Sequence, residues 1–221
     1  ENNHVPFFLW NRTRLGAEEI RIEGADVNHI RNVLRMKPGE EILISSREGG
    51  DYFCRVEELE PEYVSAKILE EWENKELPAR IHLFQGLPKG DKMELIIQKA
   101  VELGAYRVVP VSMKRSVVKL DAKKADAKRK RWNAVSESAA KQSKRSLIPE
   151  VAPLMTYKEA VKEAAGYDMV LLPYESADGI RKTRELLASV KPGTDIAVFI
   201  GPEGGFEDEE VELARETGRR S

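Results

Sequence analysis

A glycine-rich turn near the end of the chain has the composition of a ligand-binding segment. It reads Ile200-Gly201-Pro202-Glu203-Gly204-Gly205 and follows an apolar run at residues 196–199. The run predicts a buried strand, and the acidic residues 207–211 predict the first turn of a helix. Ligands of open α/β sheets bind at the carboxyl ends of strands, and glycine lets a ligand lie close to the backbone. An ordinary tight turn would contain similar residues, so both interpretations stay open.

Neither a phosphate site nor a metal site is indicated by the residues available. The turn has neither the Lys-Ser/Thr of a P-loop nor a dinucleotide Gly-x-Gly-x-x-Gly, so it suits a ligand held by backbone hydrogen bonds. The three histidines, His4, His29 and His82, are too scattered to suggest a metal. A single cysteine, Cys54, excludes an intramolecular disulfide and favours a reducing, cytoplasmic location.

Length and composition are those of a globular protein with one large domain or two small ones. The chain has 221 residues, of which 41% are hydrophobic, enough for a substantial core. The apolar run at residues 5–10 is too short to span a membrane and lacks a signal-peptide cleavage pattern. We therefore expect no association with a membrane.

Charge is distributed unevenly along the chain. The net charge is −2, yet twelve Lys and Arg face three acids between residues 114 and 145. Residues 203–216 hold seven acids against one Arg, and residues 1–73 hold sixteen acids against nine bases. A concentrated basic segment in an acidic protein indicates a polyanionic partner, although a solvated helix face would have the same composition.

Two regions differ in their predicted elements. Residues 1–73 contain short β-prone stretches at 20–22, 41–44, 52–56 and 63–68, which favour a small β-barrel interrupted by a helix over 26–35. After a polar linker near residues 73–78, strands at 81–87, 107–111, 169–172 and 195–200 alternate with helices at 92–103, 122–145 and 180–190. Such alternation predicts a parallel sheet covered by helices.

The basic helix also has an apolar stripe. Trp132, Val135, Ala139 and Gln142 recur at helical spacing, so the stripe is apolar until it ends in an amide. The run 128–131 surrounds the helix, and therefore only part of it can face one partner.

Several motifs occur in the order and context of one known family. They are Lys89-Gly90-Asp91, residues 97–104, Arg115-Ser116, Gln142-Ser143 with Arg145, and residues 200–205. In these motifs the chain resembles the bacterial 16S ribosomal RNA uridine-N3 methyltransferases of the SPOUT (trefoil-knot) class. Residues 29–36 with Pro38-Gly39 resemble the PUA-like RNA-binding barrel of that family. The resemblance covers nearly the whole chain and rests on the motifs together.

The resemblance implies a fold and a function. The expected fold is α/β, with a PUA-like β-barrel at residues 1–73 and a SPOUT trefoil-knot domain at 74–221, whose parallel sheet has helices on both faces. The expected reaction is S-adenosylmethionine-dependent methylation of a uridine N3 in 16S rRNA of the small ribosomal subunit, by a cytoplasmic homodimer. The alternatives are a SPOUT methyltransferase that acts on another RNA position and a non-catalytic RNA-binding assembly factor. Glycines at 201, 204 and 205 favour the enzyme.

The resemblance also implies site residues. The cofactor pocket would be walled by Leu172, Pro173, Tyr174, Glu175, Ile200, Gly201, Pro202, Glu203, Gly204 and Gly205. The catalytic set would be Arg115, Gln142, Arg145 and Glu203, of which the first three would hold the nucleotide or nearby phosphates. RNA contacts would come from His29, Arg31, Arg35, Lys89, Arg115, Lys128, Arg129, Lys130, Arg131 and Arg145.

Some of these roles have competing explanations. Glu203 is a candidate general base, but its position before a helix also suits a partner of the helix dipole. Glu102 shares a helix stripe with Glu94 and Gln98, which suits a solvated face. His29 and the arginines near it are also typical of surface or packing residues, and the acidic balance of residues 1–73 weakens the case for RNA contact.

The end of the chain departs from the family pattern. The family continues with a strand and a loop resembling Leu-Gly-x-Arg-Ile-Leu-Arg-x-Glu-Thr-Ala, which threads the knot and closes the cofactor pocket. This sequence stops at Gly218-Arg219-Arg220-Ser221 with nothing similar. We therefore expect weak or no cofactor binding by the 221-residue chain alone.

Overall fold

The computed structural model describes residues 7–10, 13–15, 18–46, 50–72, 76–173 and 179–218. The chain divides into two units, and the division is not a single cut in the sequence. The first unit comprises Glu1–Glu76 together with Lys141–Leu147, and the second comprises Leu77–Ala140 and Ile148–Ser221. The domain boundary at residues 73 and 74 remains a prediction.

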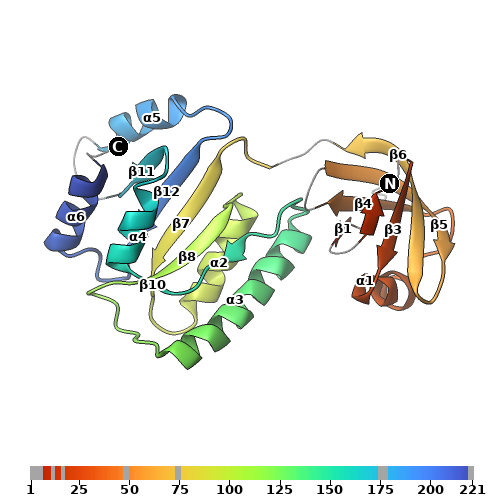
Figure 1. Ribbon diagram of the computed structural model, residues 1–221, viewed down its shortest axis with the longest axis horizontal. Coiled ribbons are helices and arrows are strands. Elements are labelled where there is room, and N and C mark those ends of the chain that lie inside the picture. The colour runs from red at the N-terminus through yellow and green to blue at the C-terminus, as the bar shows by residue number, and fades with distance from the viewer. Residues whose placement is uncertain are drawn as a thin grey trace. The chain divides into compact units, whose positions relative to one another are not determined.

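The first unit is built on a six-stranded, mostly antiparallel sheet (Figure 1). Its strands are β1 (Phe7–Trp10), β2 (Thr13–Leu15), β3 (Glu19–Glu23), β4 (Glu41–Ser46), β5 (Gly50–Leu59) and β6 (Tyr63–Trp72). The order is β1-β4-β5-β6-β3-β2, and only the β1–β4 pair is parallel. Alternating residues of β3 and β4, including Ile20, Ile22, Ile42 and Ile44, form the core with Ile30. The strands therefore follow the period of two that their sequence predicts.

The helical segment of this unit differs from the expected helix over 26–35. It consists of α1 (Ala25–Asn28) and a π-helical turn, η1 (His29–Val33). The wider turn appears in the hydrogen bond that the Leu34 amide donates to the His29 carbonyl, five residues earlier, at 2.9 Å. Arg35 has a φ of 53°, in the left-handed region, and this conformation ends the helical segment at that point.

The second unit contains a parallel sheet in the order β10-β8-β7-β12-β11, with β9 paired to β8. Its strands are β7 (Arg80–Gly86), β8 (Arg107–Ser112), β9 (Glu150–Val151), β10 (Met155–Thr156), β11 (Met169–Leu171) and β12 (Asp195–Ile200). Its helices are α2 (Lys92–Glu102), α3 (Ala122–Gln142), α4 (Tyr157–Ala164), α5 (Gly179–Ala188) and α6 (Asp208–Gly218). The last two residues of α3 are grouped with the first unit.

Helices cover both faces of the parallel sheet. Neighbouring residues of β8, Val108 and Val109, belong to different buried clusters because successive side chains of a strand point to opposite faces. Val108 packs in the cluster that contains α2 and α3, and Val109 packs in the cluster that contains α4 and α6. Figure 1 shows these two pairs of helices on opposite sides of the sheet. The predicted α/β class, with an antiparallel unit followed by a parallel sheet between helices, is confirmed.

Three observed elements, β9, β10 and α4, were not among those expected from the sequence. Each of the two strands has only two residues, too few to establish a period. Helix α4 did carry a signal, because Thr156 and Glu159 form a capping box in which each side chain meets the other's backbone amide. No helix in the described part of the chain is long and apolar enough to cross a membrane.

Candidate functional site

The glycine-rich turn forms one wall of a cavity at the carboxyl end of the parallel sheet. The cavity has a volume of about 560 Å³, within the range of small-molecule sites. It is lined by Arg115, Pro173, Ile200, Gly201, Pro202, Glu203, Gly204, Gly205, Phe206 and Asp208. Six consecutive lining residues belong to the turn that the sequence singled out. The turn therefore lines a cavity large enough for a small ligand, and its role as a cofactor wall remains a prediction.

Tight packing of the turn on itself explains why glycines occupy it. The Gly205 amide donates to the Pro202 carbonyl at 2.8 Å, and Gly205 has a φ of 70°, which side chains rarely adopt. A Cβ on Gly201 would lie 3.1 Å from the Gly205 backbone. Gly204 has no positive φ, but a Cβ there would lie 3.1 Å from the Arg115 Cβ. Each of the three glycines thus meets a different local requirement.

The end of the neighbouring strand β7 contributes two residues that were not expected at the site. The buried Gln85 amide donates to the Gly86 carbonyl at 2.9 Å and approaches the Gly201 carbonyl at 3.4 Å. A Cβ on Gly86 would lie only 2.6 Å from the Pro202 Cδ, so the turn lies directly on this strand end. In the sequence, the signal that could have pointed to Gln85 and Gly86 is an amide followed by a glycine at the end of an apolar strand.

Glu203 is held by the loop that follows β7 and by the first residue of α2. Its carboxylate accepts a hydrogen bond from Lys92 Nζ at 2.8 Å and contacts the Lys89 amide at 3.2 and 3.3 Å. The Lys92 hydrogen bond is the main cause that lowers the pKa of Glu203 to about 2. A carboxylate with so low a pKa is a weak proton acceptor near neutral pH. Its role as general base remains a prediction, and the geometry favours a structural task.

Arg115 contacts the opposite end of the same turn. Its Nη1 donates to the Gly204 carbonyl at 2.7 Å, and its Nε donates to Glu207 at 2.8 Å. The Glu207 hydrogen bond is the main cause of a raised pKa for Arg115 and of a lowered pKa for Glu207. The adjacent Lys114 amide donates to Glu210 in α6 at 2.9 Å. The structure thus brings Arg115 and Glu203 to one turn.

Gln142 and Arg145 belong to the first unit, and the position of that unit relative to the glycine-rich turn is not determined. Gln142 is the exposed last residue of α3. Arg145 is buried, and its Nε lies 3.2 and 3.1 Å from the two carboxylate oxygens of Glu76. The next residue, Ser146, donates to the buried Asp51. Arg145 therefore has a structural partner, and its predicted catalytic role is untested.

The second predicted wall of the cofactor pocket is described only in part. Pro173 lines the cavity, whereas Leu172 packs against the core that contains α4 and α6. Tyr174 and Glu175 lie outside the described residues. Among the described residues, no group of His, Cys, Asp and Glu could hold a metal ion.

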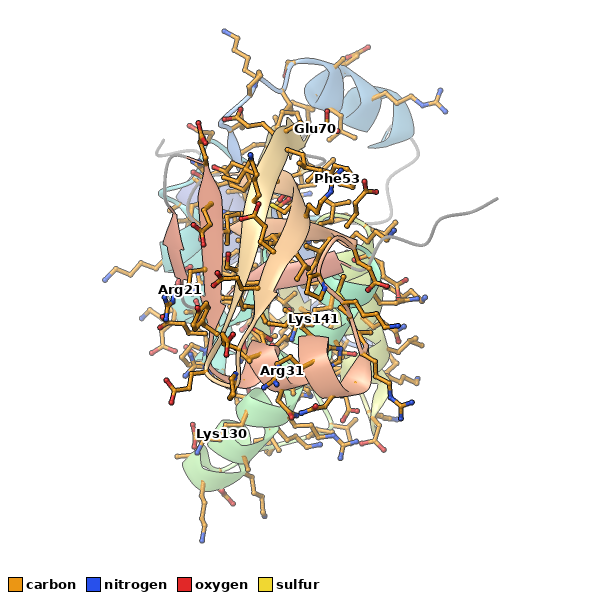
Figure 2. The ribbon with its side chains drawn as sticks, turned by 90° about the vertical axis from the view of Figure 1, so that its right-hand side faces the viewer. Arg21, Arg31, Phe53, Glu70, Lys130 and Lys141 are labelled. Atoms are coloured by element: carbon orange, nitrogen blue, oxygen red, sulfur yellow. The ribbon has the colours of Figure 1, made fainter. Side chains whose placement is uncertain are left out.

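The predicted RNA contacts are distributed over both units. His29, Arg35 and Lys89 are exposed, and Arg31 is half-buried. Figure 2 labels Arg31 on the helical segment of the first unit and Lys130 on α3.

In the basic run on α3, residues 128–131, several side chains form ion pairs with acidic residues of the same chain. Arg129 donates to Glu150 at 3.0 Å and to the Val151 carbonyl at 3.1 Å. Arg131 contacts Glu94 at 2.7 Å. Lys130, which pairs with Asp126, is more exposed than Arg129 and Arg131, with 79% of its side chain accessible. Because exposed ion pairs are weak, phosphates can compete for Lys130 and Arg131 more readily than for Arg129.

Comparison with family models gives two matches. Residues 75–221 match a model described as an RNA methyltransferase domain, and residues 22–69 match one described as an RNA methyltransferase PUA domain.

Named relatives carry similar descriptions. The ribosomal RNA small subunit methyltransferase E of Bacillus subtilis is 38% identical over 205 residues, which cover 90% of this chain and 80% of that protein. The protein of the same name from Aquifex aeolicus is 30% identical and covers 96% of this chain and 88% of its own length.

Solved structures extend the likeness to three dimensions. A ribosomal RNA small subunit methyltransferase E from Neisseria gonorrhoeae, bound to S-adenosyl methionine, matches with a TM-score of 0.71 and 30% identity. The match covers 97% of this chain and 87% of that one. A putative methyltransferase from Legionella pneumophila, in complex with the bound cofactor SAM, matches with a TM-score of 0.74 and 28% identity over 97% of this chain and 87% of that one.

Proposed function

This chain belongs to the RNA methyltransferase family, and we propose from that premise that it methylates N3 of a uridine in the 16S rRNA of the small ribosomal subunit. S-adenosylmethionine is the methyl donor in this proposal. Two relatives whose structures hold that molecule support the choice. The uridine N3 position rests on the motif resemblance, which includes residues 200–205.

The observation that carries the proposal is the cavity walled by the glycine-rich turn. Its volume of about 560 Å³ suits a nucleoside-sized ligand, and three glycines line one wall without side chains that would separate a ligand from the backbone. Such a wall fits a donor recognised through main-chain hydrogen bonds. The residues of this chain therefore fit S-adenosylmethionine, which would supply an electrophilic methyl group when bound.

Binding and orientation are the tasks left to the protein. Arg115 is exposed beside the cavity, so its guanidinium can meet an incoming nucleotide while its Nη1 holds the Gly204 carbonyl. Holding two reactants in line is worth up to about 7–11 kcal/mol in favourable cases. The same family resemblance supports a homodimer in the cytoplasm, with the PUA-like unit adding contacts to RNA.

Methyl transfer to purified small subunits tests the proposal. The full-length protein is incubated with radiolabelled S-adenosylmethionine and either small subunits or naked 16S rRNA, and the RNA is digested to nucleosides. Label in 3-methyluridine supports the proposal. Label in another nucleoside favours a methyltransferase for a different position. RNA binding without any label favours the assembly factor.

A further inference from the structure

Two charged contacts attach the glycine-rich turn to the segments that follow two neighbouring strands. On one side Glu203 meets Lys92 Nζ at 2.8 Å and the Lys89 amide, both of which follow β7. On the other side Arg115, which follows β8, meets Glu207 at 2.8 Å and the Gly204 carbonyl at 2.7 Å. The two contacts hold both halves of a turn that connects β12 to α6.

Lys92 and Glu207 do not line the cavity themselves. The lining residues include Glu203 and Arg115, the partners through which Lys92 and Glu207 would act. Lys92 is the first residue of α2, a helix whose Met93, Ile97 and Val101 are buried in the core. The ammonium group that meets Glu203 therefore extends from a firmly packed helix, although the pair itself is exposed to solvent.

We propose that Lys92 and Glu207 are positioning residues that hold the cofactor wall in its binding conformation before the cofactor arrives. This inference rests on the proposed function of the same cavity. A turn with three glycines loses more conformational entropy on ordering than other sequences do. A wall that is already ordered spares cofactor binding that cost. Releasing either contact should therefore weaken cofactor binding while leaving the fold intact.

A matched pair of variants on α2 tests the first contact. Lys92→Ala removes the contact with Glu203. Lys99→Ala removes an ion pair with Glu102, at 2.7 Å, which lies within α2 and does not involve the turn. In the full-length protein, isothermal titration should show a two- to fivefold rise in the Kd for S-adenosylmethionine for Lys92→Ala, roughly the range that an exposed pair supports. The Kd of Lys99→Ala should stay at the wild-type value.

Further variants separate positioning from a general structural role. Lys92→Arg should restore the Kd, and Lys92→Ala combined with Glu207→Gln should raise it more than either change alone. The melting temperature of Lys92→Ala should match that of Lys99→Ala, and KM for the cofactor should rise more than kcat falls.

The outcomes distinguish the inference from the function on which it rests. Absence of S-adenosylmethionine binding by a wild-type chain that includes the closing loop expected from the family pattern would contradict the proposed function. Wild-type binding with equal Kd values for Lys92→Ala and Lys99→Ala would overturn the inference alone. Loss of RNA affinity in Lys92→Ala with an unchanged cofactor Kd would also overturn it and would make Lys92 an RNA contact.

Discussion

Replacing Gly86 with alanine tests how closely the cofactor wall must lie on strand β7. The new Cβ would lie 2.6 Å from the Pro202 Cδ, 2.7 Å from the Pro202 nitrogen and 2.8 Å from the Met113 Sδ. Ordinary contact begins near 3.4 Å, so Pro202 must move by about 0.8 Å. Met113 can rotate away, but a proline ring in a tight turn cannot.

The strain can be relieved by a shift of the strand or by a shift of the turn, and each shift has a measurable effect of known magnitude. If the buried strand yields, overpacking costs roughly 1–3 kcal/mol of unfolding free energy. Each kcal/mol lowers the melting temperature by about 2–4 °C in a protein of this size. If the turn yields, a displacement near 1 Å lowers turnover up to about a hundredfold. Because the turn is exposed at Glu203 and Gly204 while the end of β7, residues 84–86, is buried, we expect the turn to move.

Gly166→Ala is the matched control, because a Cβ there meets only the Glu163 carbonyl at 3.6 Å. Cofactor Kd, turnover and melting temperature are measured for both full-length variants. Gly86→Ala should lose affinity and turnover with a melting temperature near that of the control. Normal cofactor binding by Gly86→Ala would refute the reasoning that Pro202 must lie against β7.

Three further predictions concern other parts of the chain. Lys130→Ala should lower the slope of log RNA affinity against log salt by about 0.7–0.9, as expected for one phosphate contact, whereas an unchanged slope would make Lys130 only a solvated side chain. Burial raises the pKa of the Cys54 thiol to about 12, so iodoacetamide should label it only in the unfolded protein; rapid labelling of the native protein would contradict this burial. A hydrogen bond from Arg80 holds the pKa of Asp195 well below its usual range, so its contribution to stability is present at neutral pH and is lost as the pH falls below that range. Urea titrations from pH 7 to pH 2 should therefore show a shallower acid loss for Asp195→Asn than for the wild type, and parallel curves would exclude this contribution.

Local patterns in the sequence were sufficient for the elements that carry the site. An apolar run before a glycine-rich turn correctly predicted β12, and the turn that follows this strand lines a cavity. The stripe of Trp132, Val135 and Ala139 correctly predicted the face of α3 that packs in the core. Each of these features is determined within one turn or a few residues, because burial repeats with the period of the element.

The contacts between residues far apart in the sequence could not be predicted from local patterns. Glu203 and Lys92 are 111 positions apart, and they meet because β12 pairs with β7 in the sheet. Strand order is a long-range property that no local period encodes. Likewise, Gly86 is needed because Pro202 and Met113 lie against it, and Arg145 meets Glu76 through the fold of the first unit.

The discontinuous first unit has a consequence for synthesis on the ribosome. All six strands of its sheet have been made once the chain reaches Trp72, yet the buried Asp51 and the half-buried Glu76 gain Ser146 and Arg145 only from a segment made much later. Until then Asp51 keeps its hydrogen bond from Ser45 but lacks the one from Ser146, and the Arg145 contact that helps to offset the cost of burying the Glu76 charge has not formed. The nascent sheet therefore remains less stable than the finished unit until the end of α3 has emerged, and its maturation is coupled to the synthesis of much of the second unit.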